Sequence, residues 1–226
     1  MNIAVENSSL NLPLIACVLL LTACSGSALR WTPDYHTVRS GETLYSIAHS
    51  YGLDYRQLAN WNGLGDGSVI RDGQRLRLKP SGSAANGSSS GSSSRASSTP
   101  AVPAPAWSWP TAGNVYLNFG ASQKTESGIR ITGSDGQPVR SAAAGEVVYA
   151  GSGLASYGNL LIIKHNETWL SAYGFNSVLL VREGQNVALG QNIARMGQDS
   201  SGRPVLHFEI RRNGQPVDPV RYLPAR

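Results

Sequence analysis

Residues 203–212 read RPVLHFEIRR, and this stretch indicates how the second half of the chain folds. Apolar residues surround a histidine in a run without glycine, which is typical of a buried β-strand. Successive side chains on a strand alternate between its faces, so Val205, His207 and Glu209 share one face. A histidine and a glutamate on the same face look like half of a metal site. The remaining ligands would have to come from other strands.

Residues 107–226 continue the same pattern outward from this strand. Short apolar segments alternate with glycine-containing turns, and none has a sustained helical period. The segments are GEVVYAG (145–151), NLLIIKH (159–165), TWLSAYG (168–174) and QNIARMG (191–197). The sequence therefore predicts a mostly antiparallel all-β domain over residues 107–226.

Residues 36–79 predict a separate, small α+β unit. The apolar residues of LYSIAHSY (44–51) recur at helical spacing and end at Gly52, which favours one short helix. Asp54 with Gln57 forms a capping-box pattern for a second helix. A strand candidate precedes the helices and another follows them, so the predicted order is βααβ.

The N-terminus predicts a lipoprotein signal peptide over residues 1–23. Its apolar part is too short to span a bilayer comfortably and ends in Leu21-Thr22-Ala23-Cys24, which resembles the lipobox of bacterial lipoproteins. The resemblance implies cleavage before Cys24, acylation of its thiol, and a membrane anchor worth about 0.8 kcal/mol per buried methylene. Ser25 then implies the outer membrane. The alternative is a plain secretory peptide with a chance cysteine.

Charge and composition define the remaining segments. The chain carries 19 Lys and Arg against 14 Asp and Glu without a basic block, so we expect no nucleic-acid partner. Residues 24–35 are predicted to be a tether. Residues 80–106 are rich in Ser, Gly, Ala and Pro and are predicted to be a flexible linker, spanning roughly 30 Å on average.

The unit at 36–79 closely resembles a LysM domain. The resemblance rests on RSGETLYSIA (39–48), Asn62-Gly63 and VIRDGQRL (69–76). It implies binding of N-acetylglucosamine-containing glycan, here peptidoglycan strands, in a shallow groove. The implied walls are Gly41, Glu42, Thr43 and Leu44 on one side and Ser68, Val69 and Ile70 on the other. Alternatively, Leu44 and Ile70 belong only to the core. His49 lies off the apolar helix face and is expected to be exposed.

The second domain resembles the LytM, or lysostaphin-type, metallopeptidase domain. The segments that carry this resemblance are Gly128-Ile129, GQPV (136–139), AGEVVYAG (144–151), YGNL (157–160) and HFEI (207–210). Active members hold zinc through H-x-G-x-D and H-x-H motifs and use a further histidine in Y-x-H.

Most of those positions lack a suitable side chain in this sequence. The motif positions hold Glu126, Arg130, Gly174, Val205 and His207, so only His207 matches the pattern. A catalytic zinc needs about three protein ligands, and Arg130 would place a permanent cation beside it. We expect no metal, no cofactor and no catalytic residue, with Arg130 paired to Glu126 or Glu209. His165 is expected to be a structural, hydrogen-bonded histidine.

A lipobox, a LysM unit and a ligand-poor LytM domain together resemble the NlpD-type murein hydrolase activators. This resemblance implies an outer-membrane lipoprotein that faces the periplasm and activates zinc N-acetylmuramoyl-L-alanine amidases during cell separation. The amidase would bind a groove whose implied residues are Glu126, Arg130, Tyr157, Tyr173, Gly174, Val205 and His207. Two alternatives are a peptidoglycan-binding scaffold without activator role and an active zinc endopeptidase.

Overall fold

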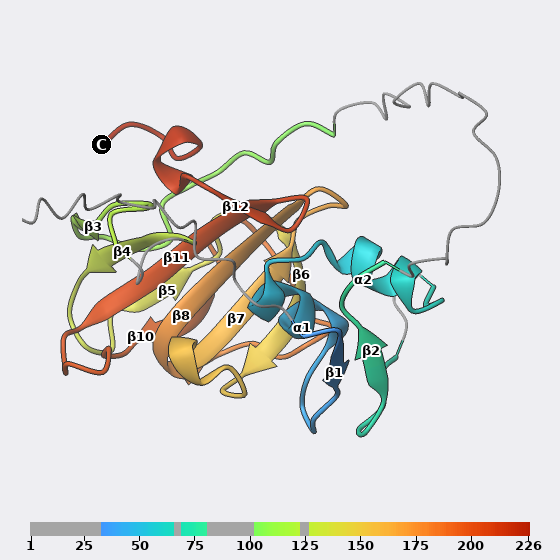
Figure 1. Ribbon diagram of the computed structural model, residues 1–226. Coiled ribbons are helices and arrows are strands. Elements are labelled where there is room, and N and C mark those ends of the chain that lie inside the picture. Colours follow the sequence, from blue (N-terminus) through green and yellow to red (C-terminus); the bar gives the residue numbers. More distant parts are fainter. Residues whose placement is uncertain (1–32, 66–68, 81–101, 123–126) are drawn as a thin grey trace, which may run out of the picture. The chain divides into compact units, whose positions relative to one another are not determined.

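The computed structural model describes residues 33–65, 69–80, 102–122 and 127–226. Our predictions for Cys24, Ser68 and Glu126, and for most of the linker, fall outside these residues. The described chain contains a two-stranded sheet and a ten-stranded sheet (Figure 1). We refer to residues 33–80 as the first module and to residues 102–226 as the second module.

The first module has the predicted order βααβ. Its elements are β1 (Tyr35–Thr37), α1 (Leu44–Tyr51), α2 (Tyr55–Trp61) and β2 (Arg75–Arg77). The two strands pair antiparallel, with Tyr35 opposite Arg77. Tyr35 therefore belongs to the folded module rather than to the tether predicted over residues 24–35.

The helices of the first module begin and end at capping residues. At α1, Thr43 Oγ1 accepts a hydrogen bond from the Ser46 amide, and Ser46 Oγ accepts one from the Thr43 amide. This reciprocal capping box lies one helix earlier than the one predicted at Asp54. Gly52 ends α1 with φ at 66°, a left-handed conformation that glycine adopts without strain. The Asp54 carboxylate accepts from the amides of Arg56 and Gln57 and caps α2.

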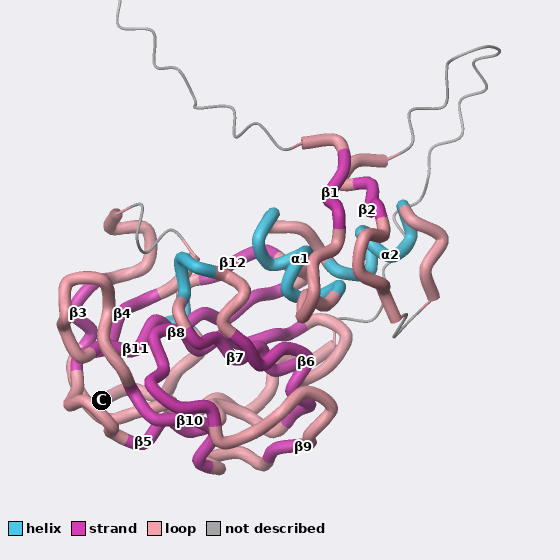
Figure 2. Tube along the Cα trace, turned by 90° about the horizontal axis from the view of Figure 1, so that it is seen from below, coloured by secondary structure: helices cyan, strands magenta, loops and turns pink. Residues whose placement is uncertain are grey.

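The second module is one large antiparallel sheet. Its strands are β3 (Val115–Leu117), β4 (Ile129–Thr132), β5 (Pro138–Arg140), β6 (Gly145–Gly151), β7 (Asn159–Lys164), β8 (Trp169–Leu179), β9 (Asn186–Val187), β10 (Asn192–Met196), β11 (Val205–Arg212) and β12 (Gln215–Val217). The main path runs β3-β4-β11-β8-β7-β6-β9, while β12 pairs with β11, and β10 pairs with both β5 and β8. Figure 2 shows β6, β7, β8 and β11 from below. Two 3₁₀ turns, η1 (Ala155–Tyr157) and η2 (Pro219–Arg221), complete the module.

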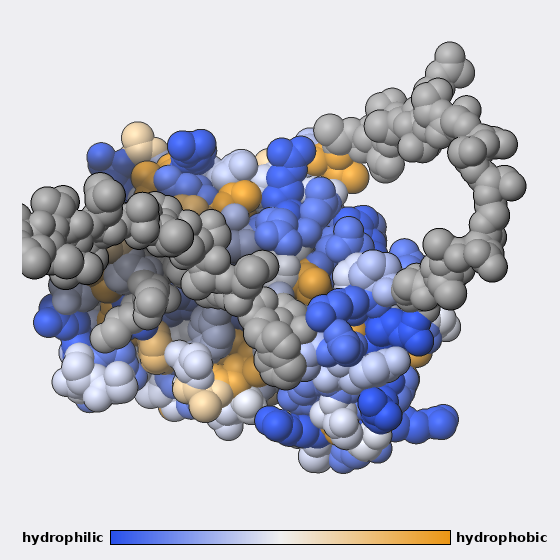
Figure 3. All heavy atoms as spheres, in the orientation of Figure 1, coloured by the Kyte–Doolittle hydropathy of each residue, from blue (hydrophilic) through white to orange (hydrophobic). Residues whose placement is uncertain are grey.

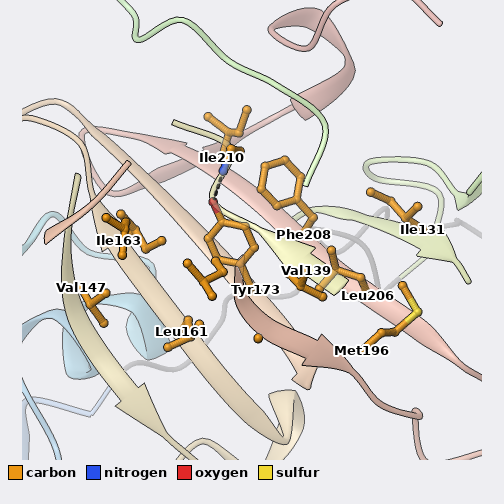
Figure 4. Close-up of a cluster of buried hydrophobic side chains, with 14 of the residues drawn as sticks. Ile131, Val139, Val147, Leu161, Ile163, Tyr173, Met196, Leu206, Phe208 and Ile210 are labelled. Atoms are coloured by element: carbon orange, nitrogen blue, oxygen red, sulfur yellow. Dashed lines mark hydrogen bonds between the residues drawn. The ribbon is translucent and has the colours of Figure 1, made fainter. Parts of the chain in front are cut away.

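The main core lies on one face of this sheet. Leu161, Ile163 and Tyr173 pack there with Phe208 and Ile210 (Figure 4). The Tyr173 ring points into the cluster, and its hydroxyl oxygen accepts a hydrogen bond of 2.8 Å from the Ala142 amide. This bond satisfies the polar end of a side chain that is otherwise surrounded by carbon.

Strand β7 is buried on both of its faces. Leu161 and Ile163 join the main core, whereas Leu160 and Ile162 join a second cluster with Tyr149, Leu170 and Ala172. We call this second cluster, Tyr149, Leu160, Ile162, Leu170 and Ala172, the outer cluster. The continuous apolar run NLLIIK agrees with burial on both faces, since a strand with one wet face would alternate.

The described surface mixes hydrophilic residues with small hydrophobic patches (Figure 3). Among the described residues, no helix combines the length and apolar character needed to cross a membrane.

Candidate functional site

The positions that correspond to a zinc site lie on three neighbouring strands. In the register of β11, His207 lies opposite Arg130 of β4 on one side and opposite Gly174 of β8 on the other. Val205 shares the face of His207 because it lies two residues away on the same strand. The structure thus brings together Arg130, Gly174, Val205 and His207, and we call these four residues with Tyr157 the His207 site.

Tyr173 does not belong to this site. It is adjacent to Gly174 on β8, so its side chain points to the opposite face of the sheet and into the main core. The prediction that Tyr173 forms part of a groove floor is corrected by this alternation.

Arg130 pairs with an aspartate that the sequence analysis did not select. Its Nη1 lies 3.1 Å from Asp199 Oδ2, and the guanidinium lies 4.7 Å from the centroid of the Phe175 ring. Glu209, one of the two predicted partners, bonds to other groups instead. The other predicted partner, Glu126, lies outside the described residues. Burial raises the pKa of the Asp199 carboxyl, but hydrogen bonds from Ser201 and Arg203 and the charge of Arg130 outweigh it and leave the pKa lowered.

Glu209 is the centre of a fully buried polar cluster. Its Oε1 accepts from His207 Nε2 at 2.8 Å, and its Oε2 accepts from His49 Nε2 at 3.0 Å and from Arg211 Nε at 2.7 Å. Burial raises the pKa of the carboxyl, but Arg211 and His49 hold it well below its usual value. Glu209 is therefore ionised, and Arg211 compensates its charge. We call Glu209, His49, His207 and Arg211 the Glu209 cluster.

His49 is buried rather than exposed, contrary to the prediction. It has 4% exposure, although it lies off the apolar face of its own helix. Burial lowers the pKa of its imidazole, and the positive charge of Arg211 lowers it further against the pull of Glu209. His49 is therefore neutral and donates its Nε2 hydrogen to the carboxylate.

Aromatic rings surround His207. The Tyr157 ring lies 5.3 Å from the His207 ring and 5.1 Å from the His49 ring, between centroids. Burial, followed by the charge of Glu209, raises the pKa of the Tyr157 phenol to about 12, so it stays protonated. Phe175 covers the other side at 6.2 Å. Its φ is 62°, a left-handed conformation that costs a bulky residue on the order of 1–3 kcal/mol.

This arrangement does not fit a catalytic zinc ion. Zinc needs about three protein donors with their lone pairs free. Of the described motif positions, Arg130, Gly174 and Val205 offer no donor, and His207 Nε2 already bonds to Glu209. Glu209 also carries a guanidinium 2.7 Å from one oxygen. Within the described ranges, no group of three His, Cys, Asp or Glu side chains could hold a metal ion.

The predicted glycan-binding walls line a single cavity of about 720 Å³. Glu42, Thr43 and Leu44 line it from one side and Val69 and Ile70 from the other. Leu44 is 6% exposed and serves the core as well, whereas Val69 is 86% exposed. Gly41, the remaining described wall residue, has φ at 78° and shapes the turn before Glu42.

Residues that were not predicted also line this cavity. Tyr45 and Tyr55 contribute rings whose centroids lie 4.3 Å apart. Glu146, Lys164 and Glu183 of the second module close the far side. The volume lies within the range of small-ligand sites, and the lining combines aromatic and polar groups.

Comparison with known proteins places both modules in families. The LysM domain family matches residues 36–79, and Peptidase family M23 matches residues 124–219. A Pseudomonas aeruginosa protein named lipoprotein NlpD/LppB homolog is 40% identical in an alignment 265 residues long, gaps included. The alignment covers 92% of this chain and 89% of that protein. This chain belongs to the NlpD/LppB lipoprotein family.

Two Escherichia coli K12 proteins extend the NlpD/LppB comparison. Lipoprotein YgeR is 37% identical over 230 residues, covering 94% of this chain and 92% of YgeR. Murein hydrolase activator NlpD is 52% identical over 126 residues, covering 56% of this chain and 33% of NlpD. The predicted LysM and LytM resemblances are confirmed by these matches.

Sequence analysis of this NlpD/LppB-family chain missed Asp199, Phe175 and Arg211. Asp199 lies in the loop between β10 and β11, where no spacing rule relates it to Arg130. Phe175 directly follows Gly174, but nothing in the sequence distinguishes it from an ordinary strand residue. Arg211 was detectable, because it continues the alternation of Val205, His207 and Glu209 on the same face of β11.

Proposed function

We propose that this protein is a peptidoglycan-binding lipoprotein of the periplasm that activates zinc N-acetylmuramoyl-L-alanine amidases and does not cut peptidoglycan itself. Relatives named murein hydrolase activator NlpD support the activator role. The LysM family match at residues 36–79 supports peptidoglycan binding. Relatives named lipoproteins, one of them an outer membrane antigenic lipoprotein, support anchoring through Cys24 in the outer membrane.

One observation supports the proposal that this chain does not hydrolyse peptidoglycan. Arg130, at the position of a metal-binding aspartate in active M23 peptidases, forms a salt bridge with Asp199 and lies beside His207 in the register. A guanidinium is permanently charged and donates only, so it replaces the dication instead of binding it. The site then serves recognition by shape, aromatic rings and paired charges rather than water activation.

The amidase partner would bind the sheet face that carries the His207 site. A ligand shifts an enzyme toward its active state only as far as it binds that state more tightly. The second module would therefore hold the active form of the amidase, and the first module would hold the complex on the glycan.

The test is release of dye from labelled sacculi by the mature chain, with and without a purified zinc amidase. We expect release only when both proteins are present, no stoichiometric zinc in the purified chain, and co-sedimentation of the chain with sacculi. Release by the chain alone, with zinc near one per chain, would show an endopeptidase. Co-sedimentation without stimulation of the amidase would show a scaffold.

The lipid anchor has its own test. Cells fed a clickable fatty acid are expected to label the wild-type protein and to leave a Cys24→Ala variant unlabelled. Equal labelling of the two would contradict acylation at Cys24.

A further inference from the structure

Helix α1 of the first module lies across the sheet face that carries the His207 site. At its beginning, Thr43 Oγ1 donates to the Val148 carbonyl of β6 at 3.2 Å. Two residues later, Tyr45 packs against the outer cluster. The helix therefore covers part of the outer apolar face of β7, beside Leu154 and Tyr157 of the second module.

The far end of α1 reaches the His207 site itself. His49 donates to Glu209 at 3.0 Å, and its ring makes an edge contact with Tyr157. Arg211 Nη1 donates to the His49 carbonyl at 3.3 Å, so both the side chain and the backbone of His49 are held by β11. Tyr157 belongs to the His207 site, and Glu209 bonds to His207 at 2.8 Å, so the end of α1 lies directly against this site.

A third set of contacts fixes the residues that follow α1. Gln215 Nε2 donates to the Gly52 carbonyl at 2.8 Å, and Tyr55 Oη donates to Glu167 at 2.6 Å. Gly214 lies so close to the first module that a Cβ atom there would stand 2.5 Å from the Leu53 carbonyl oxygen and 2.6 Å from Asp54 Cα. The contact thus runs from β6 to the turn between β11 and β12.

We propose that the first module is an intramolecular cap on the His207 site, and that it must leave this face before an amidase can bind there. This inference rests on the proposed function. It follows because Glu209 and Tyr157 cannot contact His49 and a partner at the same time. The protein would then exist as a capped, inactive form and an uncapped, active form.

Two features make the cap reversible. The imidazoles of His49 and His207 are buried, and their Nδ1 atoms have no hydrogen-bond partner among the described residues, which weakens the contact relative to a fully satisfied one. The segment 81–101 supplies about 3.4 Å of reach per residue when extended, so chain length does not hold the first module in place.

Gly214 offers a way to open the cap without touching the His207 site. Its φ is 75°, a conformation that asparagine tolerates better than other side chains, so Gly214→Asn adds a clashing Cβ atom with little strain in the turn. Gly190→Asn is the matched control. Gly190 has φ at 76°, and a Cβ atom there meets nothing within 4 Å.

The first measurement compares the accessibility of His49 between variants of the full mature chain. Diethylpyrocarbonate modifies exposed histidines, and mass spectrometry locates the product. We expect His49 of Gly214→Asn to react about tenfold faster than His49 of the wild type, because the reaction rate follows the uncapped fraction. Gly190→Asn should react like the wild type. Equal His49 rates in all three proteins, each folded by circular dichroism, would overturn the cap.

The second measurement reads the consequence for the amidase. At subsaturating concentration, Gly214→Asn should stimulate the amidase at least about threefold more than Gly190→Asn. His49→Ala, which removes the donor from the first module alone, should act in the same direction. If Gly214→Asn exposes His49 but stimulation equals that of the control, the cap does not keep the amidase off and the inference is wrong. If neither the wild type nor any variant stimulates an amidase, the proposed function is wrong. The rates of His49 modification by diethylpyrocarbonate still decide whether the cap exists.

Discussion

Single residues in the second module are held by specific hydrogen bonds rather than by burial alone. His165 illustrates this at the end of β7. Its Nδ1 lies 2.8 Å from the Ala144 carbonyl, its Nε2 lies 2.7 Å from Ser171 Oγ, and its ring packs at an edge contact against Trp107. Both ring nitrogens are satisfied, as expected for a structural histidine.

The half-buried position and the lowered pKa of His165 predict a loss of stability in acid. Burial lowers the pKa of the His165 imidazole from 6.5 to about 4, and the hydrogen bond to the Ala144 carbonyl opposes this shift only in part. A depressed pKa means that the unfolded chain takes up the proton first, so stability is complete above pH 6.5 and falls as the pH drops toward 4. The loss is on the order of 3 kcal/mol at pH 4. Urea unfolding at stepped pH values measures it.

His165→Gln serves as the comparison for this prediction. Glutamine keeps a donor and an acceptor but does not titrate, so the stability of the variant should depend less steeply on pH between 6.5 and 4. Above pH 7 the two proteins should differ by a constant amount. Parallel curves through the acid range would assign the pH dependence to other groups.

At the scale of elements, strand β7 shows what a sequence pattern can and cannot specify. The run NLLIIKH (159–165) predicted a strand, and β7 spans Asn159–Lys164, one residue shorter than predicted. The run also indicates burial on both faces, but it does not identify what covers the second face. Part of that cover is α1, whose docking residues come from more than a hundred positions earlier in the chain. His49 was predicted to be exposed for the same reason, since helical periodicity describes packing only within its own module.

The two faces of β7 should respond differently to the same substitution. Leu161 lies in the large main core, whereas its neighbour Leu160 lies in the small outer cluster beneath α1. We expect Leu161→Ala to lower the free energy of unfolding of the second module by about 2–5 kcal/mol. Leu160→Ala should cost less, because the outer cluster collapses more easily and its cover belongs to another module. Chemical unfolding followed by tryptophan fluorescence compares the pair; equal losses would contradict the two-sided packing.

At the scale of the whole molecule, the sequence predicted both modules and their separate cores but not their contact. The two sequence resemblances cover the modules independently, and neither carries information on docking. His49 could not be predicted as a member of the Glu209 cluster, because it comes from the first module and becomes a neighbour of Glu209 only after docking. The other three members follow from the alternation of side chains along β11. The resemblance assigned the zinc-site positions one by one, and of these the structure places Arg130, Gly174, Val205 and His207 on neighbouring strands.

Docking predicts coupled unfolding of the two modules. The first module gains the contacts of Thr43, Tyr45 and His49 only while it lies on the sheet, so uncapping should lower its own melting temperature. Gly214→Asn is therefore expected to show an early transition for the first module by calorimetry, separated from that of the second. In the wild type and in Gly190→Asn this transition should merge with the main one. An early transition of equal temperature in all three would show that the modules melt independently.

The outer cluster has a further consequence for how the protein can be handled. A fragment that begins after the linker would lose the cover that Tyr45 gives to the outer cluster, so part of this apolar cluster would face water on one side of the sheet. Contiguous apolar surface of this kind promotes self-association. The solubility of the second module is therefore expected to depend on the presence of the first module.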